Sequence, residues 1–105
     1  MQPLIQEIQP SELDHNDQNF QIVDIREIPE LAAGKIETAE TMPMASIPMR
    51  LAEFDRDRKI VLVCRSGARS AQACMFLQQQ GFDNVLNLRG GMIGWVQAAK
   101  PFIRG

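Results

Sequence analysis

One cysteine is followed by a short cationic turn, and these residues are the part of the sequence best suited to chemistry. Cys64 comes directly after the aliphatic run Ile60–Val63 and opens the segment Cys64-Arg65-Ser66-Gly67-Ala68-Arg69-Ser70. The run is typical of a strand buried on both faces of a parallel sheet, so Cys64 would lie at the strand's carboxyl end, where open α/β sheets bind ligands. Helical spacing resumes after Ser70. Backbone N–H groups and the helix dipole would therefore favour the thiolate form of Cys64.

Acyl transfer is a poor fit to this cysteine. A papain-like or caspase-like enzyme needs a histidine beside the nucleophile to form the thiolate and then to protonate the leaving group. The sequence contains one histidine, His15, between Asp14 and Asn16. We interpret His15 as an exposed residue of the first helical segment, so the sequence offers Cys64 no catalytic base.

Phosphatase or arsenate reductase chemistry is a minor alternative. It also uses an anion-binding loop with arginine, because phosphoryl transfer needs positive charge around the equatorial oxygens. Loops of that class carry one more residue between cysteine and arginine than the four that separate Cys64 from Arg69. The shorter ring of N–H groups suits a single sulfur atom better than a phosphate.

Sulfur transfer asks for no more than the sequence supplies. A thiolate attacks a sulfane sulfur without moving a proton, so no base is needed. We predict Cys64 as nucleophile and sulfur carrier, with the following backbone N–H groups forming a nest for the terminal sulfur of the persulfide. Arg65 and Arg69 are expected to attract an anionic donor such as thiosulfate and to help the departure of sulfite. The predicted substrate-binding residues are Arg65, Ser66, Gly67, Ala68, Arg69 and Ser70.

The rest of the chain reads as strands that alternate with short helical segments and position the loop. Strands are predicted over residues 4–8, 20–26, 41–44, 60–63 and 84–88, and helical segments near residues 10–14, 29–33, 48–54, after 70, and 92–99. Gly81 is predicted to end the helix that follows the loop. Asp24 and Arg26 are expected to hold the sheet's carboxyl edge together by polar contacts. This alternation implies an α/β fold with a mostly parallel sheet, covered on both faces and linked by right-handed crossovers.

Four segments, in order, resemble the single-domain rhodanese (thiosulfate sulfurtransferase) family. They are Asp24-Ile25-Arg26-Glu27, the stretch 34–43 with Gly34, Ile36, Ala39 and Pro43, the loop 64–70, and the closing stretch 88–95 with Gly90, Gly91 and Trp95. The resemblance covers nearly the whole chain and implies an open five-stranded sheet with helices on both faces. It also implies sulfurtransferase activity at a six-residue loop from Cys64 through Arg69. Lys35 stands where the family usually has histidine.

Composition sets further limits. The 105 residues are enough for one domain, which we place at 1–105. A formal net charge of −2 argues against nucleic acid as the main partner. No apolar run approaches the ~18 residues of a membrane-spanning helix, and the N-terminus lacks the features of a signal peptide, so we expect a cytoplasmic protein. With two cysteines, one histidine and no CxxC motif, we expect no disulfide framework, no metal site and no cofactor.

The sequence leaves two functions open. We expect a sulfurtransferase that moves sulfane sulfur from thiosulfate or a related donor to a thiol or cyanide acceptor through a Cys64 persulfide. The alternative is a persulfide relay module that exchanges sulfur with proteins of a sulfur-trafficking pathway, and it uses the same cysteine. Cys74 falls on the apolar side of the helix after the loop and is predicted to be a core residue.

Overall fold

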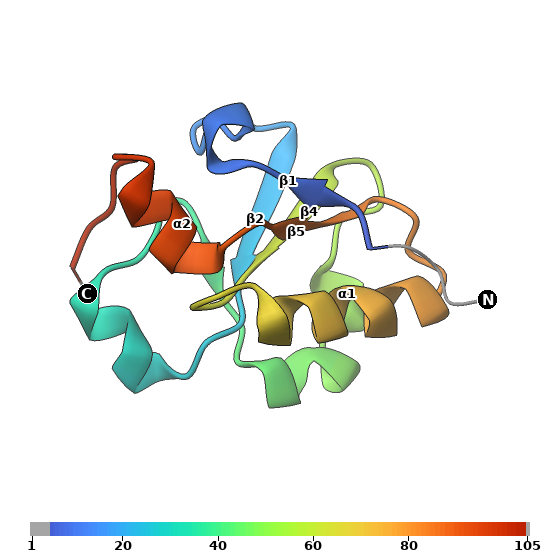
Figure 1. Cartoon of the computed structure of the whole chain (residues 1–105). Helices are drawn as coiled ribbons and strands as arrows, with labels where there is room; N and C mark the ends of the chain where they lie inside the picture. Colours follow the sequence, from blue (N-terminus) through green and yellow to red (C-terminus); the bar gives the residue numbers. More distant parts are fainter. Residues whose placement is uncertain (1–4, 105) are drawn as a thin grey trace.

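A five-stranded parallel sheet runs through the centre of the computed structural model, which describes residues 5–104 (Figure 1). Its strands are β1 (Glu7–Ile8), β2 (Phe20–Asp24), β3 (Glu40–Thr41), β4 (Lys59–Val63) and β5 (Val85–Leu88). They lie in the order β1-β5-β4-β2-β3, and every neighbouring pair is parallel. β4 is therefore the central strand, and its carboxyl end lies between those of β2 and β5.

Helical segments connect the strands and cover both faces of the sheet (Figure 1). The α-helices are α1 (Ala68–Gln79) and α2 (Gly91–Gln97). The shorter 3₁₀ segments are η1 (Pro10–Glu12), η2 (Ile28–Ala33), η3 (Met44–Met49) and η4 (Leu51–Glu53). One face packs against α1, η3 and η4, and the other packs against α2 and the segment around η1. Within residues 5–104, no helix is long and apolar enough to cross a membrane.

The side chains of β4 alternate between the two cores. Ile60 and Leu62 belong to the core under α1, whereas Val61 and Val63 belong to the core under α2. All four side chains are fully buried. A strand that contacts an apolar layer on each face has no polar side, which explains why its sequence is an unbroken aliphatic run.

The predicted α/β architecture, an open five-stranded parallel sheet with helices on both faces, is confirmed. Several predicted boundaries were wrong. The third strand covers Glu40–Thr41 rather than 41–44, because Pro43, which has no N–H to donate to a strand, is the N-cap residue of η3. The closing helix ends at Gln97 rather than residue 99, because Ala99 takes a left-handed φ of 58°.

The ends of two other strands also differ from expectation or fall outside the described residues. β2 ends at Asp24, two residues before the predicted end. The first predicted strand begins at Leu4, which lies outside the described residues, and β1 begins at Glu7. Gly81 does end α1: it has a φ of 92°, its N–H donates to Gln78, and the Phe82 N–H donates to Leu77.

The start of α2 packs directly against the cysteine loop. The Met92 N–H donates to the Cys64 carbonyl at 2.9 Å, and the Ile93 N–H donates to the Arg65 carbonyl at 3.1 Å. Gly91 makes this approach possible, because a Cβ at that position would meet the Cys64 carbonyl oxygen and would lie 2.6 Å from that of Arg65. Gly91 also has a left-handed φ of 56°. The N-terminus of α2 therefore fixes the path of the first two loop residues.

This contact predicts a difference between two glycine substitutions. Gly81 has a left-handed φ like Gly91, but apart from its chain neighbours no residue among 5–104 places a heavy atom within 4 Å of the position that a Cβ on Gly81 would occupy. We expect Gly81→Ala to lower the free energy of unfolding by about 1 kcal/mol, the cost of the left-handed backbone. Gly91→Ala adds a clash with backbone, so we expect a loss of about 3 kcal/mol or more. Urea unfolding of both variants checks this, and equal losses would show that the loop moves aside freely.

Candidate active site

Cys64 follows the last residue of the central strand, and its side chain is fully buried. Loop groups converge on its sulfur. The Gly67 N–H donates to Sγ at 3.1 Å, the Ser70 N–H at 3.4 Å and the Ser70 hydroxyl at 3.3 Å. Hydrogen bonds to the charged form of an acid stabilise that form, so this arrangement favours a thiolate.

Burial and hydrogen bonding act in opposite directions on the Cys64 thiol. Burial raises its pKa, but hydrogen bonds from the Ser70 hydroxyl and from the backbone N–H groups of Ser70, Gly67 and Ser66 outweigh burial and leave the pKa below its ordinary value. Cys74 shows the contrast, because burial raises the pKa of its thiol to about 12. Of the two thiols, Cys64 is therefore the one suited to act as a nucleophile.

The sulfur of Cys64 also completes the start of α1. Gly67 is the N-cap residue, with a left-handed φ of 99°, and no side chain of its own caps the helix. The N–H groups of a first helical turn have no intrahelical partner, and a capping side chain usually accepts one of them. Here the Ser70 N–H, in the first turn of α1, donates to the Cys64 sulfur.

The Ser70 hydroxyl has a second acceptor in Asn87 on β5. It donates to Asn87 Oδ1 at 2.5 Å, while Asn87 Nδ2 donates to the Gly67 carbonyl at 3.0 Å. Because a carbonyl can only accept, the amide nitrogen must face Gly67, which turns the amide oxygen toward Ser70. Serine has one hydroxyl proton, so Asn87 and the Cys64 sulfur compete for it.

The two arginines of the loop have different surroundings. Arg69 forms a two-point ion pair with Glu30 of η2, with N–O distances of 2.7 and 2.9 Å. The hydrogen bond from Arg69 lowers the pKa of the Glu30 carboxyl to about 2, so this pair stays charged at physiological pH. Arg65 is exposed, and its side chain makes no ion pair or hydrogen bond within residues 5–104. Arg65 is thus the unmatched positive charge of the loop.

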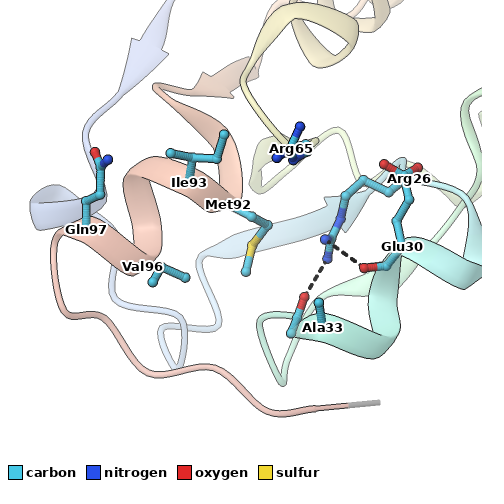
Figure 2. A pocket seen from close by; sticks show the side chains of 9 residues that line it. Arg26, Glu30, Ala33, Arg65, Met92, Ile93, Val96 and Gln97 are labelled. Carbon is cyan, nitrogen blue, oxygen red and sulfur yellow. Dashed lines mark hydrogen bonds between the residues drawn. The ribbon is translucent and has the colours of Figure 1, made fainter.

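A buried ion pair supports the rim opposite the loop. Arg26 Nη2 lies 2.8 Å from Asp24 Oδ2, and the two side chains are 5% and 1% exposed. Arg26 also donates to the carbonyls of Glu30 at 3.2 Å and Gly34 at 2.8 Å (Figure 2). The polar contacts expected at this edge are therefore present, and they tie η2 to the end of β2.

The structure gathers the predicted loop around Cys64, but the loop residues have different surroundings. Gly67 and Ser70 contact the sulfur, whereas the side chains of Ser66 and Ala68 are exposed. Sequence reasoning missed Asn87 and Glu30. Asn87 had a signal, because it is a polar residue in a strand that is otherwise aliphatic. The contact of Glu30 with the loop spans 39 positions of the chain, and nothing local indicates it.

His15 takes no part in this arrangement. It lies in a turn after η1 and is half-buried, so the expectation of an exposed helix residue was wrong. Its ring packs edge-on against Trp95, with 6.0 Å between ring centroids. Trp95 belongs to the core under α2, whereas Cys64 belongs to the core under α1. The only histidine of the chain therefore lies on the other face of the sheet from the cysteine.

Comparison with known proteins points to one family. Residues 10–98 match the family model of the Rhodanese-like domain. A protein named sulfurtransferase from Allochromatium vinosum is 51% identical over 82 residues, which are 78% of this chain and 77% of that protein. The thiosulfate sulfurtransferase GlpE of Shewanella oneidensis is 36% identical over 80 residues, or 76% of this chain and 79% of that one.

Two further comparisons extend this result. The putative sulfur carrier protein YrkF of Bacillus subtilis is 32% identical over 80 residues, which cover 76% of this chain and 43% of that protein. The crystal structure of a rhodanese-related protein from Thermoplasma volcanium superimposes with a TM-score of 0.85 at 30% identity, covering 93% of this chain and 97% of that one. The resemblance seen in the sequence is thus confirmed by the family match, the sulfurtransferase relatives and the fold. The chain belongs to the family of rhodanese-like domains.

Proposed function

We propose that this protein is a sulfurtransferase that moves sulfane sulfur from thiosulfate, or a related small anionic donor, to a thiol or cyanide acceptor through a Cys64 persulfide. The observation that carries the proposal is the convergence of the Gly67 and Ser70 donors on a sulfur atom that has no histidine beside it. The loop residues 65–70 bind the donor, and no metal or cofactor takes part. We assign this activity to residues 1–105 as one domain.

The first step forms the persulfide. The Cys64 thiolate attacks the outer sulfur of thiosulfate, a sulfur–sulfur bond forms to Cys64, and the bond to the sulfonate sulfur breaks. Sulfite leaves with the electron pair of that bond, so no proton moves. The negative charge of the persulfide lies on its outer sulfur, within reach of the N–H groups that already point at Sγ. This step needs a thiolate and N–H donors, and the loop supplies both.

The second step returns the enzyme to its starting state. A thiolate or cyanide attacks the outer sulfur, the bond between the two persulfide sulfurs breaks, and Cys64 leaves as a thiolate. The same hydrogen bonds that lower the pKa of Cys64 make it a better leaving group here. Both cysteines of the chain are free, which fits activity in the reducing cytoplasm.

A persulfide relay between proteins is the second candidate, and the similarity to a protein named as a putative sulfur carrier favours it. The chemistry at Cys64 is the same, but the donor and acceptor are proteins of a sulfur-trafficking pathway. Saturable turnover of thiosulfate with cyanide supports the enzyme. Slow turnover of thiosulfate, together with fast sulfur exchange with a persulfidated protein, supports the relay.

We expect thiosulfate to add the mass of one sulfur atom to the protein, because the persulfide forms before any acceptor is present. Intact-mass spectrometry after incubation and removal of free thiosulfate measures this gain. Cys64→Ser should abolish it and should lose cyanide-dependent turnover. Cys74→Ser is the matched control and should keep the gain, since that thiol is buried with a raised pKa. A Cys64→Ser protein that still gains sulfur would refute the proposal.

We also expect Ser70→Ala to raise the pKa of the Cys64 thiol, because the hydroxyl hydrogen bond to the sulfur is lost. A lowered pKa keeps a cysteine ionised to lower pH, so the rate of persulfide formation in this variant should rise at higher pH than in the unaltered protein. Ser66→Ala is the control, since only the backbone of Ser66 contributes to the sulfur's hydrogen bonding. The pH dependence of alkylation by iodoacetamide gives the pKa of the Cys64 thiol in each variant. Coincident profiles for Ser70→Ala and Ser66→Ala would contradict this account.

A further inference from the structure

A mostly apolar pocket of about 470 Å³ opens between α2 and η2, beside the cysteine loop (Figure 2). Met92, Ile93 and Val96 line it from α2, and Ala33 lines it from η2. Ile93 and Val96 are 41% and 47% exposed, so both present apolar surface to the pocket. The pocket is thus a concave, solvent-open surface with apolar walls.

The pocket is physically continuous with the nucleophile's loop. The backbone N–H groups of Met92 and Ile93, which line the pocket, donate to the carbonyls of Cys64 and Arg65. The side chain of Arg65 itself lines the pocket, where Figure 2 shows it between α2 and Arg26. A molecule seated in the pocket is therefore next to the loop that holds the sulfur.

Of the charged side chains that line the pocket, one cation has no partner within residues 5–104. Arg26 is paired with Asp24, and Glu30 is paired with Arg69, so these side chains are already matched within the protein. Arg65 has no such partner within residues 5–104. The pocket consequently presents apolar walls and a single unmatched positive charge at the end nearest Cys64.

Thiosulfate uses little of this pocket. Cavities of about 300 to 1,000 Å³ accommodate drug-sized organic ligands, whereas thiosulfate has five heavy atoms and no apolar surface. A double displacement brings its two substrates to the same cysteine in turn, so the volume that the donor leaves empty is available to the acceptor. The apolar walls would stabilise only an acceptor that carries an organic group.

We propose that the pocket between α2 and η2 selects the sulfur acceptor, and that this acceptor is a small organic thiol with an apolar side group and an anionic group close to its sulfur. The anionic group binds Arg65, and the apolar group lies against Ile93 and Val96. The acceptor thiolate attacks the outer persulfide sulfur, a new sulfur–sulfur bond forms, and the bond to Cys64 breaks as Cys64 leaves as a thiolate. An organic persulfide departs. The inference rests on the proposed sulfurtransferase function and specifies its acceptor.

Two thiols that differ only in the apolar group test this inference on protein first loaded with thiosulfate. Mercaptoacetate carries the thiol and carboxylate alone, and 2-mercaptohexanoate adds a butyl chain to the same carbon. We expect discharge of the persulfide by 2-mercaptohexanoate to show a half-saturation concentration about tenfold lower, since burial of a few methylene groups is worth at least one factor of ten. Equal values for the two thiols in a loaded protein would overturn the inference while leaving the proposed function intact.

Substitutions locate the preference on the protein. Val96→Ser, on the exposed side of α2, should reduce the preference for 2-mercaptohexanoate over mercaptoacetate by several-fold. Met49→Ser is the matched control, because Met49 is 86% exposed but lies outside the pocket, and it should keep the preference. Arg65→Gln should raise the half-saturation concentration of both acids, and the value for 2-mercaptohexanoate should remain lower than the value for mercaptoacetate. Loss of the preference in Met49→Ser, or its full retention in Val96→Ser, would overturn the assignment of the pocket.

Failure of the underlying function has a different signature. If Cys64 carries no sulfur after thiosulfate treatment, no discharge can be measured with either thiol, and the proposed function fails first. If the butyl chain instead speeds loading from an alkyl thiosulfonate but not discharge, the pocket serves the donor and the acceptor assignment is wrong.

Discussion

The hydrogen bonds between the Cys64 sulfur and the first turn of α1 are the interaction on which the rest of the site depends. They hold the loop around the reactive sulfur, because Sγ accepts the Ser70 N–H in the first turn of α1. No side chain caps that turn through a hydrogen bond from the N-cap residue. A negative charge at this position is stabilised by the N–H groups and by the helix dipole together. Ionisation of Cys64 and formation of the first turn of α1 therefore favour each other.

Two contacts from elsewhere in the fold hold this loop in shape. The start of α2 takes up the carbonyls of Cys64 and Arg65, so that the loop's N–H groups, and not its carbonyls, face the sulfur. Asn87 takes up the Gly67 carbonyl on the other side. Each support depends on a residue whose type is dictated by geometry. Gly91 is needed because a Cβ would strike the loop backbone, and an amide is needed at position 87 because it must donate to a carbonyl and accept from a hydroxyl.

Much of the fold could be predicted from the sequence, because its signals are local. The aliphatic run 60–63 identified a strand buried on both faces, and Gly81 identified the end of α1, since each depends on residues close together in the chain. The short strand β3 was predicted at 41–44 but lies at Glu40–Thr41, because a two-residue strand has too few side chains to show a period. The position of Cys64 at the end of the central strand followed from the same local pattern.

The charges of the site could not be predicted in this way, because pairing joins distant segments. Arg65 and Arg69 look alike in the sequence, and only the fold brings Glu30 of η2 to one of them. Nothing in residues 28–33 marks that carboxylate as a partner of the loop. Asn87 is an intermediate case: its polarity within a buried strand indicates that it has a partner, but the partner's identity depends on how β5 and the loop lie side by side.

The groups that would hold the persulfide sulfur differ from the group that would attract the departing sulfite. The groups that would hold the persulfide sulfur are backbone N–H groups and one buried hydroxyl, which already donate to the Cys64 sulfur. Arg65, in contrast, is exposed and unpaired, and an interaction with it is weakened by water and salt. Sulfite that departs from the persulfide would therefore leave the buried donors to the sulfur, and the unpaired cation that it would contact is exposed and solvated. A buried arginine in the place of Arg65 would bind the donor more tightly but would also retain sulfite, so an exposed cation suits a site that must release an anion in every cycle.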